Sequence, residues 1–185
     1  MAPSNTAELV VLVDDDGRRL GSAPKAQVHH TSTPLHLAFS CYLFDHSGNV
    51  LLTRRALHKR TFAGIWTNSC CGHPAPDEQM SDAVHRRVRQ ELGVGVAELT
   101  CVLPDFRYYA VAADGVAENE LCPVYCARVD GAVRPDPQEV MDHRWVPWEH
   151  ARTAADLGWA ISPWAAEQIP LLERAGVPQA SGSGG

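Results

Sequence analysis

The sequence has no segment typical of an export signal or a membrane span. Its first residues, MAPSNTAELVVLVDDDG, lack a basic start followed by a long apolar core, so we expect no signal peptide and a cytoplasmic location. No uncharged apolar run approaches the roughly 18 residues that a membrane span requires. Positive charge is not in excess, because the formal net charge is −6 at pH 7. This argues against nucleic acid or an anionic membrane as a partner, and an anionic substrate would need a locally basic pocket.

Paired cysteine motifs are missing as well. The chain has six cysteines but no pair of CxxC motifs, which argues against a four-thiolate zinc site. Without an export signal, disulfides are not expected. Two cysteines are adjacent in the stretch TNSCCGHPAPDE (67–78), which alone does not tell a reactive thiol from a buried turn. Most of the thiols are predicted to be small core residues, and they are Cys41, Cys70, Cys71, Cys101, Cys122 and Cys126.

Length and composition are those of an ordinary globular domain. The 185 residues are 45% hydrophobic and 21% charged, which allows one well-buried core. We expect a single domain over residues 1–176 and a disordered tail over 177–185, which ends in ASGSGG. Apolar, β-rich stretches separated by turn signals predict strands over 8–14, 35–44, 50–55, 99–111 and 118–129.

Two stretches predict helices. Residues 81–94 have apolar residues four apart, with Ser81 as the expected N-cap and Gly93 as the stop. Residues 162–176 begin with Ser162 as a cap and Pro163 at the first position, and Pro170 is expected to kink or split this helix. Strands interleaved with helices predict the α/β class, as a sandwich built on a mixed sheet.

Several histidines could contribute to a metal site. His29 and His36 lie seven residues apart, before and at the start of the predicted strand 35–44, and His73 follows the adjacent cysteines. His30 leaves the register ambiguous, because either neighbour could face inward. Spacing alone also leaves open that each histidine is a separate surface or hydrogen-bonded residue.

Two glutamates could complete such a site. Glu118 and Glu120 are two residues apart, so both carboxylates point to the same face of a strand. Three imidazoles and two carboxylates suit a borderline divalent cation such as Mn²⁺ or Zn²⁺.

The stretch from Gly72 to Val94 resembles the Nudix box, G-x5-E-x7-R-E-U-x-E-E-x-G-U, where U is aliphatic. That box is a loop–helix–loop that holds divalent cations against a diphosphate. The positions that match it are Gly72, Glu78, Arg86, Val88, Glu91, Gly93 and Val94.

Two departures from the box bear on its chemistry. Hydrolytic Nudix enzymes use a carboxylate cluster to bind Mg²⁺ and activate water. Here Arg87 replaces one of those glutamates and Gln90 another, so only Glu91 remains near the helix end. Arg87 lies one helical turn before Glu91 on the same face, so a guanidinium and a metal could both meet one diphosphate. A plain amphipathic helix with a charged face is the alternative interpretation.

A more specific resemblance covers residues 8–170. The sequence is similar to bacterial type I isopentenyl-diphosphate Δ-isomerases, a branch of the Nudix superfamily whose fold is an α/β/α sandwich with a mixed sheet. The segments that carry the resemblance are LHLAFS (35–40), LLTRRALHK (51–59), GIWTNSCCGHP (64–74), RRVRQELGV (86–94), PDFRYYA (104–110), ENELCPV (118–124), QEVMDHRWV (138–146) and ISPW (161–164).

The resemblance implies a role for each matching residue. His29, His36, His73, Glu118 and Glu120 would hold one Mn²⁺ or Zn²⁺. Glu91 and the backbone oxygen of Cys71 would help to hold a Mg²⁺ that also touches the diphosphate. Lys25, Arg55, Lys59 and Arg87 match the basic residues around the diphosphate. Cys71 precedes Gly-His-Pro and matches the reactive cysteine, whereas Cys70 is expected to be a packing residue. Tyr108 matches the hydroxyl near the catalytic glutamate, and Trp164 the indole over the hydrocarbon.

The implied reaction interconverts isopentenyl and dimethylallyl diphosphate. Protonating the terminal methylene forms a tertiary carbocation, which then loses a proton from C2. We expect Glu120 to deliver the first proton and Cys71, as a thiolate favoured by nearby metal and cations, to take the second. Trp164 would lie against the cation, where an indole face contributes about 0.5–2 kcal/mol.

Two other functions are compatible with parts of the sequence. One is a Nudix hydrolase of a nucleoside or isoprenoid diphosphate, against which the two altered box positions argue. The other is a diphosphate-binding or metal-binding module without catalysis, for which a reactive thiol would be unnecessary. The expected partner is a small isoprenoid diphosphate, with no nucleic acid or membrane, and the chain is expected to act as a monomer.

Overall fold

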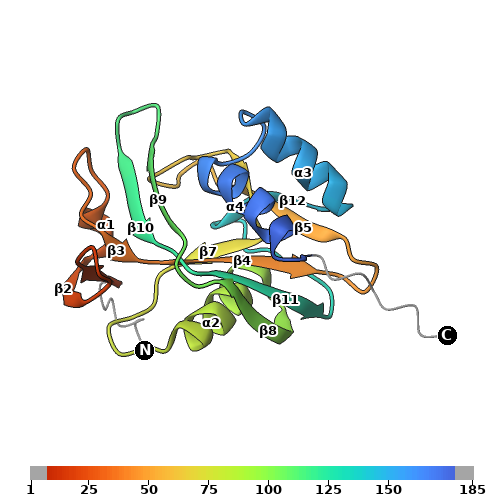
Figure 1. The fold of residues 1–185 in the computed structure, drawn as a ribbon, viewed down its shortest axis with the longest axis horizontal. Coiled ribbons are helices and arrows are strands. Elements are labelled where there is room, and N and C mark those ends of the chain that lie inside the picture. Colours follow the sequence, from red (N-terminus) through yellow and green to blue (C-terminus); the bar gives the residue numbers. More distant parts are fainter. Residues whose placement is uncertain (1–7, 178–185) are drawn as a thin grey trace.

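The computed structural model describes residues 8–177, so residues 178–185 of the tail predicted over 177–185 lie outside the described part, and Val177 packs against the core. Two β-sheets form the centre of the molecule (Figure 1). The first has the order β2-β1-β3-β10-β9. Its strands are β1 (Leu9–Val13), β2 (Arg19–Pro24), β3 (His36–Leu37), β9 (Arg107–Val111) and β10 (Ala117–Leu121).

The second sheet has the order β12-β5-β4-β11-β8, with β6 beside β5 and β7 beside β4. Its strands are β4 (Phe39–Phe44), β5 (Val50–Arg55), β6 (Trp66–Thr67), β7 (Cys70–Gly72), β8 (Gly95–Leu103), β11 (Val124–Asp130) and β12 (Val140–Val146). The pairs β4–β11 and β3–β10 are parallel and the other pairs antiparallel, so the predicted mixed pairing is confirmed.

Helices cover both faces of the second sheet, which confirms the α/β/α sandwich (Figure 1). On strand β4, Phe39, Cys41 and Leu43 pack toward α2, and the alternate residues Tyr42 and Phe44 pack toward α3 and α4. Two separate buried cores result, one on each face. The helices are α1 (Lys25–Val28), α2 (Met80–Leu92), α3 (Trp148–Leu157) and α4 (Pro163–Arg174).

Three stretches predicted as single strands are each two strands in different sheets. Residues 35–44 divide at Ala38 into β3 and β4, residues 99–111 into β8 and β9, and residues 118–129 into β10 and β11. At the crossing, the amide of Ala38 donates to the carbonyl of Leu121 and the amide of Cys122 donates to that of Phe106. The chain therefore passes from one sheet to the other through short connections, residue 38, residues 104–106 and residues 122–123, which brings the inner ends of both sheets together.

Both predicted helices form, with differences at their ends. Helix α2 begins at Met80, so Ser81 lies in the first turn and is not the cap, while Gly93 ends the helix with φ 62° as expected. In α4, the Ser162 hydroxyl accepts from the Ala165 amide at 3.4 Å. Pro170 does not split α4, because buried residues on both sides of it pack into the core.

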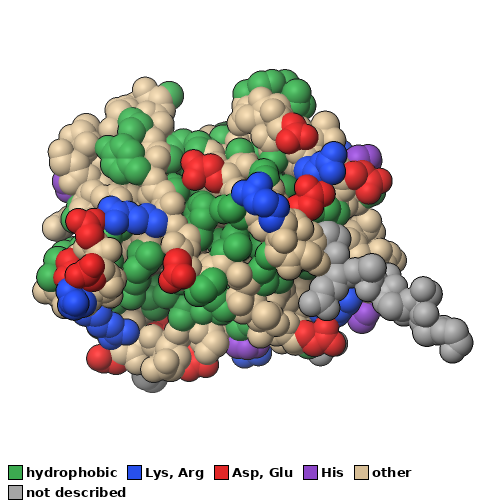
Figure 2. Space-filling view, in the orientation of Figure 1, with side chains coloured by type: hydrophobic (Ala, Val, Ile, Leu, Met, Phe, Trp, Pro, Cys, Tyr) green, Lys and Arg blue, Asp and Glu red, His purple; other side chains and the backbone are tan. Residues whose placement is uncertain are grey.

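No helix among the described residues is long and apolar enough to cross a membrane. On the face shown in Figure 2, acidic and basic side chains are interspersed. The predicted strands 8–14 and 50–55 are confirmed as β1 and β5, and all six cysteines are free thiols, as expected.

Candidate active site

A pocket of about 770 Å³ is lined by residues of both sheets, of α2 and of the first turn of α4. All the predicted site residues except His36 line it, and His36 is buried next to three that do. The predicted residues that line it are Lys25, His29, Arg55, Lys59, Cys71, His73, Arg87, Glu91, Tyr108, Glu118, Glu120 and Trp164.

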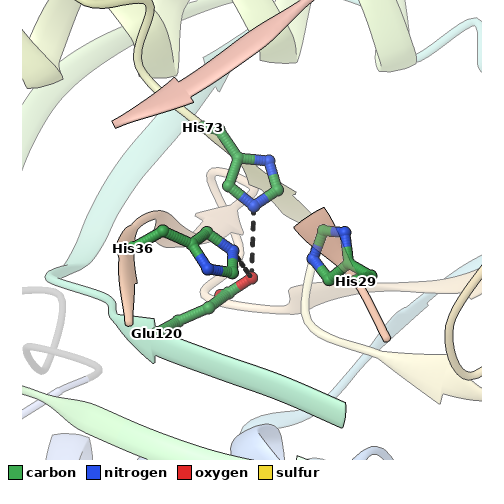
Figure 3. Close-up of side chains that lie close together, drawn as sticks. All are labelled: His29, His36, His73 and Glu120. Carbon is green, nitrogen blue, oxygen red and sulfur yellow. Dashed lines mark hydrogen bonds and ion pairs between the residues drawn. The ribbon is translucent and has the colours of Figure 1, made fainter. Parts of the chain in front are cut away.

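Three histidines and one glutamate converge at one end of this pocket (Figure 3). One ligand atom each of His29, His36, His73 and Glu120 lies within 4.8 Å of the others. His36 lies opposite Glu120 because β3 and β10 pair in parallel, and His29 and His73 directly follow α1 and β7. His30 instead accepts a bond from the Ser32 amide through Nδ1, so the ambiguity between neighbours is resolved in favour of His29.

Hydrogen bonding prepares this cluster for a metal. The Nδ1 of His36 lies 2.9 Å from the carbonyl of Pro34, which can only accept, so Nδ1 carries the proton. The lone pair is then on Nε2, which is buried without a hydrogen-bond partner and lies 3.5 Å from Glu120 Oε1. An imidazole whose far nitrogen donates to a carbonyl is the usual arrangement of a metal ligand. The donor set therefore fits a divalent metal ion.

The protonation states of His29, His73 and Glu120 agree with that assignment, whereas that of His36 departs from it. Burial lowers the pKa of His29 to about 4, and burial also lowers the pKa of His73. Burial would lower the pKa of His36 too, but the Glu120 carboxylate outweighs it and the pKa is raised. Burial acts to raise the pKa of Glu120, and the adjacent imidazoles of His36 and His73 outweigh it and hold this pKa well below its usual value. An ionised carboxylate and neutral imidazoles are the forms that bind metals.

Glu118 lies in the same pocket but outside this four-residue cluster. Its carboxylate accepts from the hydroxyl of Thr61 and from the Tyr108 hydroxyl at 2.6 Å. The Tyr108 hydroxyl is also 2.8 Å from Glu120 Oε2, so it bridges the two carboxylates. Burial and the neighbouring Glu120 raise the pKa of Glu118. To act as a fifth ligand, the Glu118 carboxylate would have to turn toward the three histidines.

The two adjacent cysteines face opposite sides of β7. Cys70 is buried in the core beneath α2, and burial raises its pKa well above the usual value, which supports a packing role. Cys71 contacts the other core, and its sulfur lies 3.2 Å from Asn68 Oδ1 and 3.6 Å from Ser40 Oγ. Burial raises the pKa of the Cys71 thiol to about 12, outweighing the opposing effects of Ser40 and Arg55. The protein's own groups therefore favour a thiol at Cys71, and the expected thiolate depends on the bound metal.

Trp164 forms an apolar wall of the pocket. Its ring is buried, with its centroid 5.5 Å from that of Tyr108 and 5.2 Å from that of Phe62, which meets it edge-on at 83°. The Arg55 guanidinium carbon is 5.8 Å from the ring centroid. A cation already lies near this indole face, in keeping with its predicted affinity for positive charge.

The basic cluster, defined as Lys25, Arg55, Lys59 and Arg87, lines the same pocket. Three of its members are paired with carboxylates. Lys25 lies 3.1 Å from Glu8, Lys59 is bonded to Glu139, and Arg87 is bonded to Glu91 and lies 3.3 Å from Glu139. Sequence reasoning missed Glu8 and Glu139, because neither is near the Nudix box and only tertiary contacts bring them to the pocket.

The Nudix-box residues hold the loop against the helix. The Arg86 guanidinium bonds Glu78 at 2.7 Å and the carbonyl of His73 at 3.1 Å. A Cβ on Gly72 would lie 2.8 Å from Arg87 Cγ, which explains the glycine by close packing. Arg87 and Glu91 face the pocket together, as predicted from their spacing.

Comparison with known proteins places these features in one family. The family model described as NUDIX domain matches residues 34–170. An isopentenyl-diphosphate Delta-isomerase of Mycolicibacterium vanbaalenii is 74% identical over 96% of this chain and 98% of its own length. The isomerase of the same name from Frankia alni is 56% identical over 91% of this chain and 88% of its own length.

Solved structures share the fold at low identity. The crystal structure of DR0079 from Deinococcus radiodurans has a TM-score of 0.70 and 18% identity, covering 89% of this chain and 98% of its own. A MutT protein from Methanosarcina mazei has a TM-score of 0.59 and 21% identity, covering 76% of this chain and 94% of its own. With a matching domain and relatives of high identity over almost their full length, the chain belongs to the isopentenyl-diphosphate Delta-isomerase family of NUDIX-domain proteins.

Proposed function

We propose that this protein interconverts isopentenyl diphosphate and dimethylallyl diphosphate, in isoprenoid biosynthesis. The observation that carries the proposal is that a thiol, Cys71, and a carboxylate, Glu120, line one pocket together with the basic cluster. The name and 74% identity of the Mycolicibacterium relative support it. The hydrolase alternative receives less support, because Arg87 and Gln90 occupy carboxylate positions of the box and Arg87 neutralises Glu91.

The basic cluster would bind the diphosphate. Arginine meets a phosphate with two parallel donors and lysine with a point charge. Glu8, Glu91 and Glu139 now neutralise three of these cations. A diphosphate would have to displace those carboxylates or share their partners. This supports a site built for an anion inside an acidic protein.

Two metal sites are part of the proposal. The first site would hold Mn²⁺ or Zn²⁺ through His29, His36, His73 and Glu120. Glu118 would be a fifth ligand if its carboxylate turned toward the three histidines. Glu91 and the backbone oxygen of Cys71 would help to hold Mg²⁺. A bound divalent ion supplies positive charge that neutralises the diphosphate and fixes ligating carboxylates.

The hydrocarbon end would lie against Trp164, between Cys71 and Glu120. In the forward direction, the Glu120 carboxyl gives a proton to the terminal methylene, and the alkene becomes a tertiary cation. Cys71 as a thiolate then takes a proton from C2, and the new double bond forms. Glu120 is left as a carboxylate and Cys71 as a thiol. Tyr108, bonded to Glu120 Oε2, orients the carboxylate.

The protonation states of Cys71 and Glu120 without substrate match those at the end of the forward reaction. The protein's own groups favour a thiol at Cys71 and an ionised Glu120, which are the products of the forward reaction. By microscopic reversibility, the same pair is ready for the reverse direction, in which Cys71 protonates C2 and Glu120 removes a methyl proton. A proton must pass back from Cys71 before each forward turnover.

Incubation in heavy water tests this function. The protein with Mg²⁺ and Mn²⁺ should convert isopentenyl diphosphate to dimethylallyl diphosphate with deuterium in the methyl group, and should release no phosphate. Cys71→Ser and Glu120→Gln should each lose about 10²–10⁴-fold in rate, the usual contribution of a positioned acid or base. Phosphate release without deuterium uptake would instead establish a hydrolase. If the protein shows neither activity, the remaining interpretation is a binding protein without catalysis.

The location and assembly are also proposals. Free thiols at all six cysteines are in keeping with a reducing compartment, and we propose that the enzyme acts in the cytoplasm as a monomer.

A further inference from the structure

We propose that Asn68 is a positioning residue whose single amide oxygen fixes the side chains of Cys71 and Trp164 relative to each other. The role rests on the proposed function, because it matters only if both side chains meet the same substrate. Asn68 lies between β6 and β7 and is fully buried. It does not line the pocket, so it would act through its neighbours.

The amide oxygen of Asn68 accepts bonds from three side chains. The Thr67 hydroxyl lies 2.8 Å from Oδ1, the Cys71 sulfur 3.2 Å, and the Trp164 indole nitrogen 3.0 Å. Cys71 and Trp164 come from β7 and from the first turn of α4, which are far apart in sequence. One atom therefore fixes the distance between the reactive sulfur and the aromatic wall.

The orientation of this amide is not ambiguous. Its nitrogen donates to the carbonyls of Cys41 at 3.1 Å and Cys70 at 2.9 Å. A backbone carbonyl only accepts, and the indole N–H of Trp164 only donates. A flipped amide would set oxygen against oxygen and N–H against N–H, so Oδ1 must face Cys71 and Trp164. The two carbonyls belong to β4 and β7, which pair with each other, so the amide is anchored to the sheet.

Few other side chains could serve here. Leucine would leave the Trp164 indole N–H without its acceptor and would remove one acceptor each from the Cys71 thiol and the Thr67 hydroxyl, and an ionised aspartate has no N–H for the Cys41 and Cys70 carbonyls. A buried polar group without its partner costs about 1–3 kcal/mol. Misplacing a reacting group by about 1 Å costs up to about 10²-fold in rate, so the effect of losing Asn68 should fall on kcat.

The variant Asn68→Ala tests the proposal, with Ser69→Ala as the matched control. Ser69 is the next residue and is equally buried. Its hydroxyl accepts from the Leu43 amide at 2.8 Å and donates to the Leu51 carbonyl at 2.6 Å, away from the pocket. Both variants thus lose buried hydrogen bonds of the same segment, but only the first frees Cys71 and Trp164.

The expected results are a kcat about 10–100-fold lower in Asn68→Ala with the KM for isopentenyl diphosphate within about two-fold, because the basic cluster is untouched. Ser69→Ala should keep kcat within about two-fold. The Trp164 indole N–H resonance, assigned by its loss in Trp164→Phe, should move upfield in Asn68→Ala only. In the double variant Asn68→Ala, Trp164→Phe, the loss in kcat should be smaller than the product of the single losses.

Equal kcat values for Asn68→Ala and Ser69→Ala, or an unmoved indole resonance, would overturn the proposal. If Asn68→Ala does not fold, Asn68→Ser keeps a polar side chain whose oxygen lies one bond nearer the backbone, and the indole resonance should again move upfield; no movement would again overturn the proposal. The indole measurement needs no substrate. It therefore tests the positioning even if the wild-type protein fails to isomerise isopentenyl diphosphate, a failure that would refute the proposed function.

Discussion

Replacing Gly72 by alanine should destabilise the protein and weaken its site together. A Cβ at this position would lie 2.8 Å from Arg87 Cγ and 3.0 Å from two ring atoms of Phe39. Phe39 is fully buried and Arg87 nearly so. Neither neighbour can move freely, because Phe39 lies in the core beneath α2 and Arg87 is bonded to Glu91.

The size of the effect follows from these contacts. Inserting one carbon into a well-packed site typically costs about 1–3 kcal/mol. For a protein of this length that corresponds to a fall in Tm of about 2–12 °C. The more mobile of the two neighbours is Arg87, whose guanidinium would shift in the pocket. We therefore also expect a higher KM for the diphosphate substrate.

Thermal and urea denaturation of the metal-free protein would measure the stability change, with Gly95→Ala as the control. No atom lies within 4 Å of a Cβ added at Gly95, and its backbone is not in the left-handed region. Gly95→Ala should therefore be neutral or up to about 1 kcal/mol more stable. If Gly72→Ala unfolds within about 0.5 kcal/mol of Gly95→Ala, the steric explanation of the box glycine is wrong.

Three further predictions concern charge, sulfur and metal. Burial lowers the pKa of Lys59 to about 8, so this amine loses its proton as the pH rises through about 8. kcat/KM should then fall by about 10-fold or more, and Lys59→Arg should move the fall to higher pH; an unchanged profile would contradict this. Cys70→Ala should keep kcat within about two-fold, whereas Cys71→Ala should lose at least about 10²-fold in the isomerase assay. Mn²⁺ or Zn²⁺ at about 100 times its Kd should stabilise the protein by about 2.7 kcal/mol in thermal denaturation. His29→Ala should reduce that gain and His30→Ala should not.

Much of the fold was predictable, but the way the chain changes sheets was not. Apolar periodicity located β1, β5, α2 and α4, because these elements bury a face in the usual way. Residues 35–44 are mostly apolar on both sides of Ala38, with one polar residue on each side, His36 and Ser40, so nothing in them signals a change of partner. Pro104 and Pro123 lie in the other two breaks and are the only local signals there. The exchange is decided by pairing between β3 and β10 and between β4 and β11, which are distant in sequence.

The residues of the site were predicted largely through the resemblance to a family. Spacing alone could place Glu118 and Glu120 on one face, and it could not show that Thr61 and Tyr108 hold Glu118 away from the histidines. Asn68 and Glu139 lie in segments that carry the resemblance, but the resemblance gave neither residue a role, and their contacts with Trp164 and Lys59 are set by tertiary structure. The thiolate expected at Cys71 depends on a bound metal as well as on nearby cations; without the metal, burial raises the pKa of the thiol to about 12, an effect that a count of nearby cations leaves out.

Lys25 and Lys59 are the only two lysines in the sequence, and both line the pocket. An amine-selective probe therefore finds no lysine elsewhere on this chain. Reductive methylation with ¹³C-formaldehyde would give lysine NMR signals that come from this pocket alone. For the same reason, attaching the enzyme to a solid support through its lysines would block the pocket proposed for the substrate.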